Sequence, residues 1–378
     1  MTCIICELNP LHNGHKYLID TALDDTVVLI MSGNYTQRGS AAVYDKYTRA
    51  KAAVKAGADL VVELPFPWCS AGAADFAAAG VRIASAMGAD RLVFGSGSGN
   101  VELLSKAGEA FAGEDFDAVF ADASRADPAK GAAKLRERLL GELFTPDEAK
   151  LLSNPNDILG IEYYRYAYGT GVKCCPVLRT EGGSVTSATT IRSMIYDKGI
   201  DTAKEFIPPV AYGVFTDAVP TNESALYDTA RLLFRMDKCD INAAECEGGL
   251  GYRLRRIAGE CDSGAELLRL AATKKYTDAR IRRAVLYSIF GITRDMLKEP
   301  PLYTTILGIG KSGAGILKGL KKSDSIEILT KAADFCKLSD KARRQFDITA
   351  SADRLYTMLM GQSCPEEYFL SVTPYVEK

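Results

Sequence analysis

The chain has 378 residues, which is long enough for two domains. Hydrophobic residues make up 47% of the sequence and charged residues 25%, and the formal net charge is −2, values that are ordinary for a soluble globular protein. No apolar run reaches 18 residues and no basic leader precedes a cleavable apolar segment, so the sequence predicts neither a membrane span nor secretion. Several of the ten cysteines lie in apolar segments, as buried reduced thiols do, and we expect a cytoplasmic location.

The two histidines of the chain, His12 and His15, stand where the predicted structure changes from strand to helix. Residues 3–6 form a short apolar run that predicts a buried strand. After Gly14 the apolar positions take helical spacing. A helix N-terminus favours a phosphate group, and Gly14 has no Cβ to block an approaching nucleotide. This junction is therefore a candidate phosphate site.

Two other interpretations of the histidine pair stay open at this point. Histidines three residues apart can bind a metal, although no cysteine or carboxylate stands at a convincing companion spacing nearby. They can equally be structural or surface residues. The residue types alone do not separate these possibilities from a phosphate site.

The rest of the first half alternates strands with helices. Strands are predicted at residues 26–31, 59–64 and 90–94, and helices at residues 45–56 and 70–88. Such alternation is typical of a doubly wound, mostly parallel α/β sheet of the Rossmann-like type. Ligands of these sheets bind at the carboxyl ends of the strands, so we expect the histidine loop and Gly95 to share one edge.

The second half has a different pattern. Residues 101–150 predict a helical insertion and residues 153–167 an amphipathic helix, and residues 172–179 predict an edge strand because they contain a proline. Periodicity fades and prolines accumulate near residue 206, where we place a domain boundary between residues 1–205 and 206–378. The second domain is predicted to be mainly helical, with one strand-like segment at 303–309.

Two further features suggest an anionic ligand. Ser187 and Thr189 are hydroxyl residues at a predicted helix start, and Arg192 follows within about one turn, where it can donate to a phosphate. Residues 252–344 carry 20 Lys and Arg but 10 Asp and Glu, a net charge of +10, which leaves −12 for the remainder of the chain. A polyanionic partner for the basic block is one explanation, and a solvated helical surface is the other.

Taken together, residues 12–15 (HNGH) and 187–192 (SATTIR) resemble the HxGH and S-x-T-x-I-R motifs of one nucleotidyltransferase superfamily. A longer series of segments, spread over nearly the whole chain, is similar to the bacterial tRNA(Met) cytidine acetate ligase family. The segments are residues 7–15, 31–39, 45–50, 59–65, 94–96, 155–163, 187–192, 273–277, 280–283 and 307–308.

The resemblance implies a ligase that activates acetate with ATP, expected to act with Mg²⁺, to acetyl-adenylate and pyrophosphate. It then acetylates N4 of the wobble cytidine of elongator tRNA-Met. His12, His15 and Arg192 are implied as catalytic residues that stabilise charge on the phosphates. The implied nucleotide-binding residues are Ile4, Ile5, Cys6, Glu7, Leu8, Asn9, Pro10, Leu11, His12, Asn13, Gly14, His15, Lys16, Gly95, Asn156, Arg179, Ser187 and Thr189.

The same resemblance and the basic block indicate a tRNA surface in the second domain. We expect it to include Lys274, Lys275, Arg280, Arg282 and Arg283, with the cations exposed together on a helix that starts near Thr277. The chain departs from the family at Leu8 and Leu11, where aromatic residues are usual, and in a short loop at 180–186.

Two alternatives belong to other functional classes. A small-molecule nucleotidyltransferase, which adenylylates a phosphorylated cofactor precursor, shares both phosphate motifs but gives the basic second domain no purpose. A non-catalytic RNA-binding protein with a degenerate nucleotide fold would not need both histidines and Arg192. The sequence identifies neither the magnesium ligands nor the group that removes the N4 proton.

Overall fold

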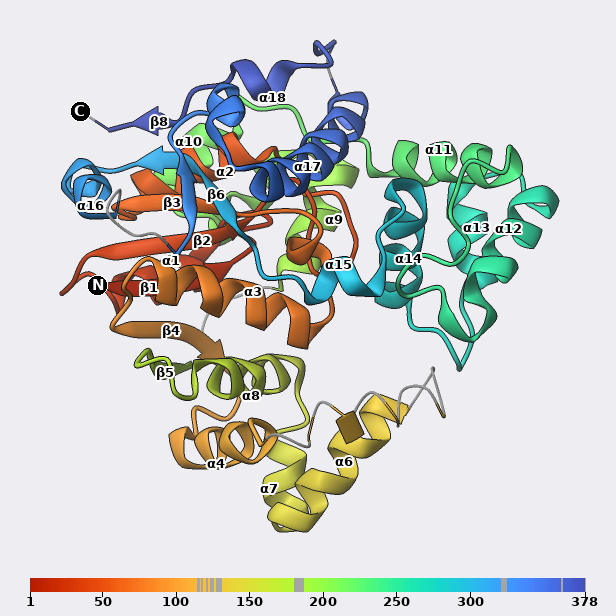
Figure 1. The fold of residues 1–378 in the computed structure, drawn as a ribbon. Helices are drawn as coiled ribbons and strands as arrows, with labels where there is room; N and C mark the ends of the chain where they lie inside the picture. Colours follow the sequence, from red (N-terminus) through yellow and green to blue (C-terminus); the bar gives the residue numbers. More distant parts are fainter. Residues whose placement is uncertain are drawn as a thin grey trace.

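The structure is a computed structural model and describes residues 1–113, 116, 118–119, 122, 126, 131–179, 187–320, 325–361 and 363–377. Its strands form one mixed sheet (Figure 1). The strands are β1 (Thr2–Cys6), β2 (Val27–Ser32), β3 (Leu60–Leu64), β4 (Arg91–Ser96), β5 (Lys173–Leu178), β6 (Tyr303–Ile309), β7 (Glu327–Leu329) and β8 (Tyr375–Val376).

The helices cover both faces of this sheet and build a separate lobe (Figure 1). They are α1 (Asn13–Asp20), α2 (Lys46–Lys55), α3 (Ala73–Ala86), α4 (Val101–Phe111), α6 (Gly131–Leu143), α7 (Pro146–Leu151), α8 (Pro155–Ala167), α9 (Ala188–Lys198), α10 (Pro209–Phe215), α11 (Glu223–Arg235), α12 (Leu250–Glu260), α13 (Gly264–Ala271), α14 (Asp278–Phe290), α15 (Arg294–Lys298), α16 (Gly313–Leu320), α17 (Asp340–Leu359) and α18 (Tyr368–Ser371).

The first five strands are parallel and confirm the predicted doubly wound sheet. Their order is β5-β4-β1-β2-β3, so the chain moves outward from β1 to β3 and then returns across the sheet to β4. Since parallel crossovers are right-handed, this reversal places α1 and α2 on one face and α3 on the other. The β1 and β2 side chains are buried throughout, as expected for central parallel strands.

The predicted boundary at residue 206 does not separate the sheet from the second half. The predicted strand at 303–309 is confirmed as β6, but it pairs antiparallel with β3, and β8 pairs with β6. All seven residues of β6 are buried, and β3 supplies both the hydrogen-bond partners and the apolar surface that such a strand needs. The lobe that stands apart in Figure 1 consists of helices α11–α14, which we call the helical lobe.

Several predicted elements are confirmed by their local chemistry. Ser187 caps α9 and Thr277 caps α14, each accepting a backbone N–H with its hydroxyl group. β5 is the outer strand of the sheet, where its proline is tolerated. The described part of the predicted insertion at 101–150 is helical, and the remainder of that insertion, like the loop at 180–186, lies outside the described residues.

The cysteines agree with the expectation from their apolar surroundings in the sequence. All ten cysteines are free thiols, and burial raises the pKa of Cys3 and of Cys6 to about 12, so both act as apolar residues of β1. Within the part of the chain that the structure describes, no helix is both long and apolar enough to cross a membrane.

Candidate active site

The histidine loop joins the carboxyl end of β1 to the start of α1, as the sequence predicts. His12 is the N-cap of α1, and its Nδ1 accepts the backbone N–H of Gly14 at 3.1 Å. His15 Nδ1 accepts the backbone N–H of His12 at 3.3 Å, and the centres of the two rings lie 3.9 Å apart. The capping arrangement therefore fixes the position of both imidazoles relative to one helix N-terminus.

These hydrogen bonds also fix the tautomers. Because each Nδ1 accepts a backbone N–H, the ring proton of each neutral imidazole is on Nε2, which becomes the free donor. Burial, together with the nearby charges of Arg179 and Arg192, lowers the pKa of His12 to about 4. Burial likewise lowers the pKa of His15, with contributions from His12 and Arg179. Both rings are thus neutral hydrogen-bond donors at neutral pH, suited to bind phosphate oxygens.

A buried arginine that the sequence analysis did not single out holds the backbone at the start of the histidine loop. Arg49 on α2 is fully buried, and its guanidinium donates to the backbone carbonyls of Glu7, Ser32 and Gly33. It therefore ties the carboxyl ends of β1 and β2 together. The only sequence signal was its place in the segment 45–50, which belongs to the family resemblance.

Residues 187–192, the second segment that resembles a phosphate-binding motif, contact the histidine loop through Arg192. Arg192 on α9 donates from Nη1 to the carbonyl of Asn9 and from Nη2 to the hydroxyl of Thr189, each at 3.0 Å. Asn9 in turn accepts the backbone N–H of Val43 with its side-chain oxygen. The N-terminus of α9, capped by Ser187, thus lies beside the loop that carries His12, so the fold brings the two motifs together.

The glycine-containing end of β4 completes the group. Arg179 donates to the side-chain oxygen of Asn156 at 3.4 Å, and a Cβ on Gly95 would lie 3.2 Å from the Arg179 side chain. Next to Asn156, the buried Asp157 accepts the backbone N–H groups of Gly97 and Ser98 and so holds the loop after β4. Asp157 was missed, and its only sequence signal was an acid at a predicted helix start, because the glycine loop that it holds lies about 60 residues earlier in the chain.

Arg179 and Arg192 donate to neutral partners. Burial lowers the pKa of the Arg192 guanidinium more than the nearby Glu7 and Glu223 carboxylates raise it, and Arg179 donates to an amide oxygen. Together with two helix N-termini and two ring N–H donors, these groups form a concentrated positive potential at the carboxyl edge of the sheet. Such a site stabilises a polyphosphate and the charge that develops on it during adenylyl transfer.

Part of the predicted nucleotide-binding stretch has its side chains in the core. Ile4, Ile5, Cys6, Leu8 and Leu11 are all less than 10% exposed and belong to the hydrophobic cluster of the sheet. Since their side chains pack inward, only their backbone can contact a nucleotide. The departures from aromatic residues at positions 8 and 11 therefore change the packing beneath the loop.

The remaining residues of the stretch reach its surface. Asn13 donates its side-chain amide to the backbone carbonyl of Glu205 at 2.9 Å, and Lys16 pairs with Asp20 on α1. Pro10 is buried. Asn13 and Lys16 therefore lie at the outer edge of the histidine loop, where they are accessible.

The expectation that the arginines of the basic segment are exposed together is wrong. Arg280 and Arg283 both pair with the buried Glu245, and Arg282 pairs with Glu223 and donates to the hydroxyl of Tyr227. The side chains of Arg280 and Arg283 are only 11% and 15% exposed. The reason is tertiary: the carboxylates come from segments 35 to 59 residues earlier in the chain.

Lys274 and Lys275 remain exposed, as predicted. They lie in the turn just before α14, where Lys275 donates to the backbone carbonyl of Gly248 at 2.8 Å and stands over the Tyr276 ring. Neither lysine has a described carboxylate partner. These two cations are therefore free to contact a polyanion.

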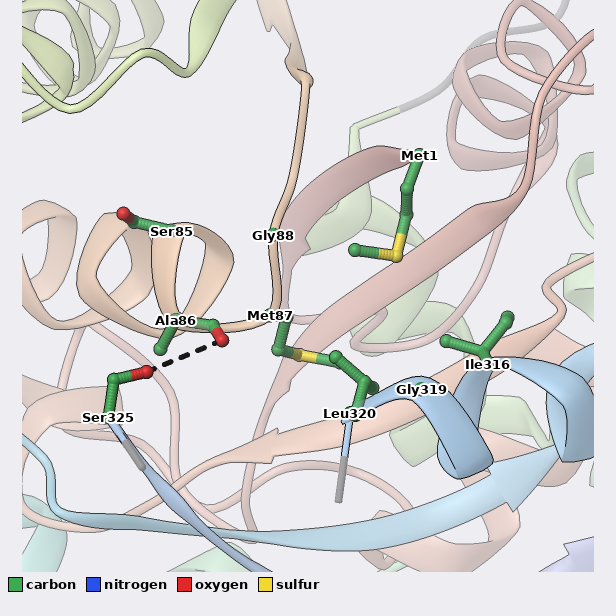
Figure 2. Close-up of a pocket in the computed structure, with 9 residues that line it drawn as sticks. All are labelled: Met1, Ser85, Ala86, Met87, Gly88, Ile316, Gly319, Leu320 and Ser325. Atoms are coloured by element: carbon green, nitrogen blue, oxygen red, sulfur yellow. Dashed lines mark hydrogen bonds between the residues drawn. The ribbon is translucent and has the colours of Figure 1, made fainter. Parts of the chain in front are cut away.

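The pocket in Figure 2 lies at the opposite end of the sheet. It is lined by Met1, Met87 and Gly88, at the amino ends of β1 and β4, together with Ile316 and Leu320 on α16. Ligands of parallel sheets bind at the carboxyl ends, so this pocket is separate from the histidine site. Among the residues that the structure describes, no group of three His, Cys, Asp or Glu side chains is arranged to hold a metal.

Comparison with known proteins agrees with this geometry. The family model for HIGH nucleotidyl transferases matches residues 1–368. Relatives include the tRNA(Met) cytidine acetate ligases of Caldanaerobacter subterraneus subsp. tengcongensis, 33% identical over 94% of both chains, and of Streptococcus thermophilus, 31% identical over 97% of both chains. The crystal structure of Thermotoga maritima TmcAL bound with alpha-thio ATP is similar, with a TM-score of 0.89, 26% identity and coverage of 99% of each chain.

Proposed function

Because this chain belongs to the tRNA(Met) cytidine acetate ligase family of HIGH nucleotidyl transferases, we propose that it acetylates the wobble cytidine of elongator tRNA-Met with ATP and acetate. The observation that carries the proposal is the meeting of two neutral imidazole donors with Arg179 and Arg192 at the carboxyl end of β1. A site with these donors, in which no carboxylate among the described residues pairs with Arg179 or Arg192, suits the triphosphate of ATP.

In the first step the acetate oxygen attacks the α-phosphorus of ATP, and pyrophosphate leaves. The Nε2–H groups of His12 and His15 donate to the α-phosphate oxygens, on which negative charge increases in the transition state. Arg192 and the N-terminus of α9 hold the outer phosphates, which become the leaving group. The histidines are thus electrostatic catalysts and exchange no proton in this step.

In the second step N4 of the cytidine attacks the acetyl carbon, and AMP leaves. Lys274 and Lys275 contact the tRNA backbone, since phosphate contacts give affinity with little sequence discrimination. The carboxyl ends of the strands are on the side of the sheet that faces the helical lobe, so an anticodon held on this lobe would approach the acetyl-adenylate from that side (Figure 1).

Magnesium is expected to arrive with the nucleotide. Mg²⁺ keeps several water ligands and binds through one or two carboxylates together with substrate phosphates, so it needs no cage of protein ligands. The described residues offer no such cage, which fits an ion held mainly by the triphosphate. Its chemistry would be to neutralise charge on the outer phosphates.

The test is acetate-dependent exchange of labelled pyrophosphate into ATP in the absence of tRNA, followed by mass analysis of tRNA nucleosides after incubation with ATP and labelled acetate. We expect exchange that requires acetate, and N4-acetylcytidine in tRNA-Met. Exchange that ignores acetate but responds to a phosphorylated acceptor would instead support a small-molecule nucleotidyltransferase. Absence of any exchange would support a non-catalytic RNA-binding protein.

A further inference from the structure

Acetyl transfer requires a proton acceptor. The lone pair of the exocyclic N4 of cytosine is delocalised into the ring, which makes the amine a weak nucleophile. Removal of its proton during the attack on the acetyl carbon therefore lowers the barrier, as general base catalysis does elsewhere. The acceptor must have an unused lone pair and must lie on the side from which the tRNA approaches.

Most acidic and basic groups of the site are already occupied. Both imidazoles accept a backbone N–H at Nδ1, and Nε2 carries the ring proton. Asp157 uses both carboxylate oxygens, which accept from Ser96, Gly97, Ser98 and Asn154. None of these groups has a lone pair free for the N4 proton.

Glu7 is different. It follows directly on β1, and its backbone carbonyl is held by Arg49. Its Oε1 accepts the backbone N–H of Gln37 at 2.8 Å, while Oε2 has no donor among the described residues. The side chain is half-buried, and its charge partly opposes the lowering of the Arg192 pKa by burial, so the two groups are neighbours. Glu7 thus presents one oriented carboxylate oxygen beside a phosphate-binding arginine.

The partner of Glu7 also shows which way its side chain faces. The carbonyl of Gln37 accepts from Arg283 on α14 at 3.4 Å, so one residue connects Glu7 to the helical lobe. Gly39, with φ +76°, lies so close to α14 that a Cβ would be 2.5 Å from the backbone nitrogen of Arg283. The Glu7 carboxylate therefore lies on the face of the histidine loop that is turned toward the helical lobe.

We propose that Glu7 is the general base of the acetyl-transfer step, an assignment that rests on the proposed function. The N4 lone pair forms a bond to the acetyl carbon, and the N4 proton passes to Oε2 of Glu7. The bond between the acetyl carbon and the phosphate oxygen breaks, and AMP leaves with its electron pair. Glu7 then releases the proton to water, and Gln37 holds Oε1 throughout.

The experiment separates the two steps in Glu7→Gln. The amide oxygen of glutamine can still accept the N–H of Gln37, but the side chain no longer takes up a proton. We expect single-turnover acetyl transfer to tRNA to fall at least about a hundredfold further than acetate-dependent pyrophosphate exchange falls, since about a hundredfold is the usual contribution of a general base. Retained exchange also demonstrates that the variant is folded.

Companion variants make the outcome decisive. Glu7→Asp keeps the carboxylate one methylene further back and should transfer acetyl faster than Glu7→Gln. Glu205→Gln, which removes an exposed carboxylate next to the Asn13 contact, should transfer at the wild-type rate. Wild-type transfer by Glu7→Gln, or loss of transfer in Glu223→Gln instead, would overturn the assignment.

Two other outcomes are distinguishable from these. Exchange that falls in parallel with transfer in Glu7→Gln would place Glu7 in adenylation and would also overturn its role as the base. Absence of acetate-dependent exchange in the wild-type protein would overturn the proposed function itself, and the Glu7 assignment with it.

Discussion

Two groups of arginines, one at the histidine site and one on α14, differ in their partners. Arg179 and Arg192 donate to an amide, a carbonyl and a hydroxyl, all neutral acceptors. Arg280 and Arg283 pair with the buried Glu245 instead. A guanidinium with neutral acceptors keeps its full charge for an incoming anion, whereas a carboxylate partner cancels it. Charge counted along a sequence therefore does not measure the charge that a ligand meets.

The largest expected effect is a loss in the free energy of unfolding when a buried ion pair of the helical lobe is broken. Arg283→Met would leave the buried Glu245 with fewer counter-ions, and breaking a buried ion pair typically costs about 3–5 kcal/mol. Urea unfolding measures this loss. The matched control is Arg256→Met, whose pair with Glu260 is exposed and should cost less than about 1 kcal/mol. Equal losses in the two variants would contradict the distinction between buried and exposed arginines.

The next effect is on catalysis in the histidine loop. His12→Ala or His15→Ala should lower pyrophosphate exchange about a hundredfold, or about 3 kcal/mol, because the Nε2–H donors act on charge in the transition state. ATP affinity, measured by equilibrium binding, should change far less. Tyr17→Phe, an exposed position on α1, serves as the control. Near-normal turnover in both histidine variants would make the loop a structural element only.

The smallest effect concerns the two exposed lysines. Replacing Lys274 and Lys275 with Glu should weaken tRNA binding about tenfold. The slope of the logarithm of the binding constant against the logarithm of the salt concentration should become less steep by up to about 0.9 for each lost phosphate contact. Pyrophosphate exchange should be unchanged, since its groups lie around the histidine loop. The control is the double replacement of the exposed Lys331 and Lys341 with Glu. An unchanged tRNA affinity in the Lys274 and Lys275 variant would leave this turn a merely solvated surface.

These variants replace a test based on Arg280 and Arg283, which sequence reasoning would have chosen. Charge reversal of those arginines would place two carboxylates against Glu245 and disturb the packing of α14 on Gly39. A loss of tRNA acetylation would then report unfolding of the lobe. The structure therefore changes which experiment is informative about RNA binding.

The sequence by itself determined the elements whose signals are local. An apolar run marks β1, a hydroxyl residue caps α9, and HNGH stands at the strand-to-helix junction. Each of these depends on backbone geometry and hydrogen bonds within a few residues, so a short stretch of sequence contains the necessary information. The shared position of the histidine loop and Gly95 also followed, since the carboxyl ends of parallel strands lie at one edge of the sheet.

Only the tertiary structure decided the partners that come from far along the chain. β6 joins β3 across about 240 residues, Arg283 meets Glu245, and the N–H of Gln37 occupies one oxygen of Glu7 but leaves the other open. Nothing in a local pattern specifies such pairs, because they depend on how buried surfaces fit and on which polar groups lose water together. For the same reason the exposure of a cation and the free lone pair of a carboxylate, which decide binding and catalysis here, are properties of the folded chain.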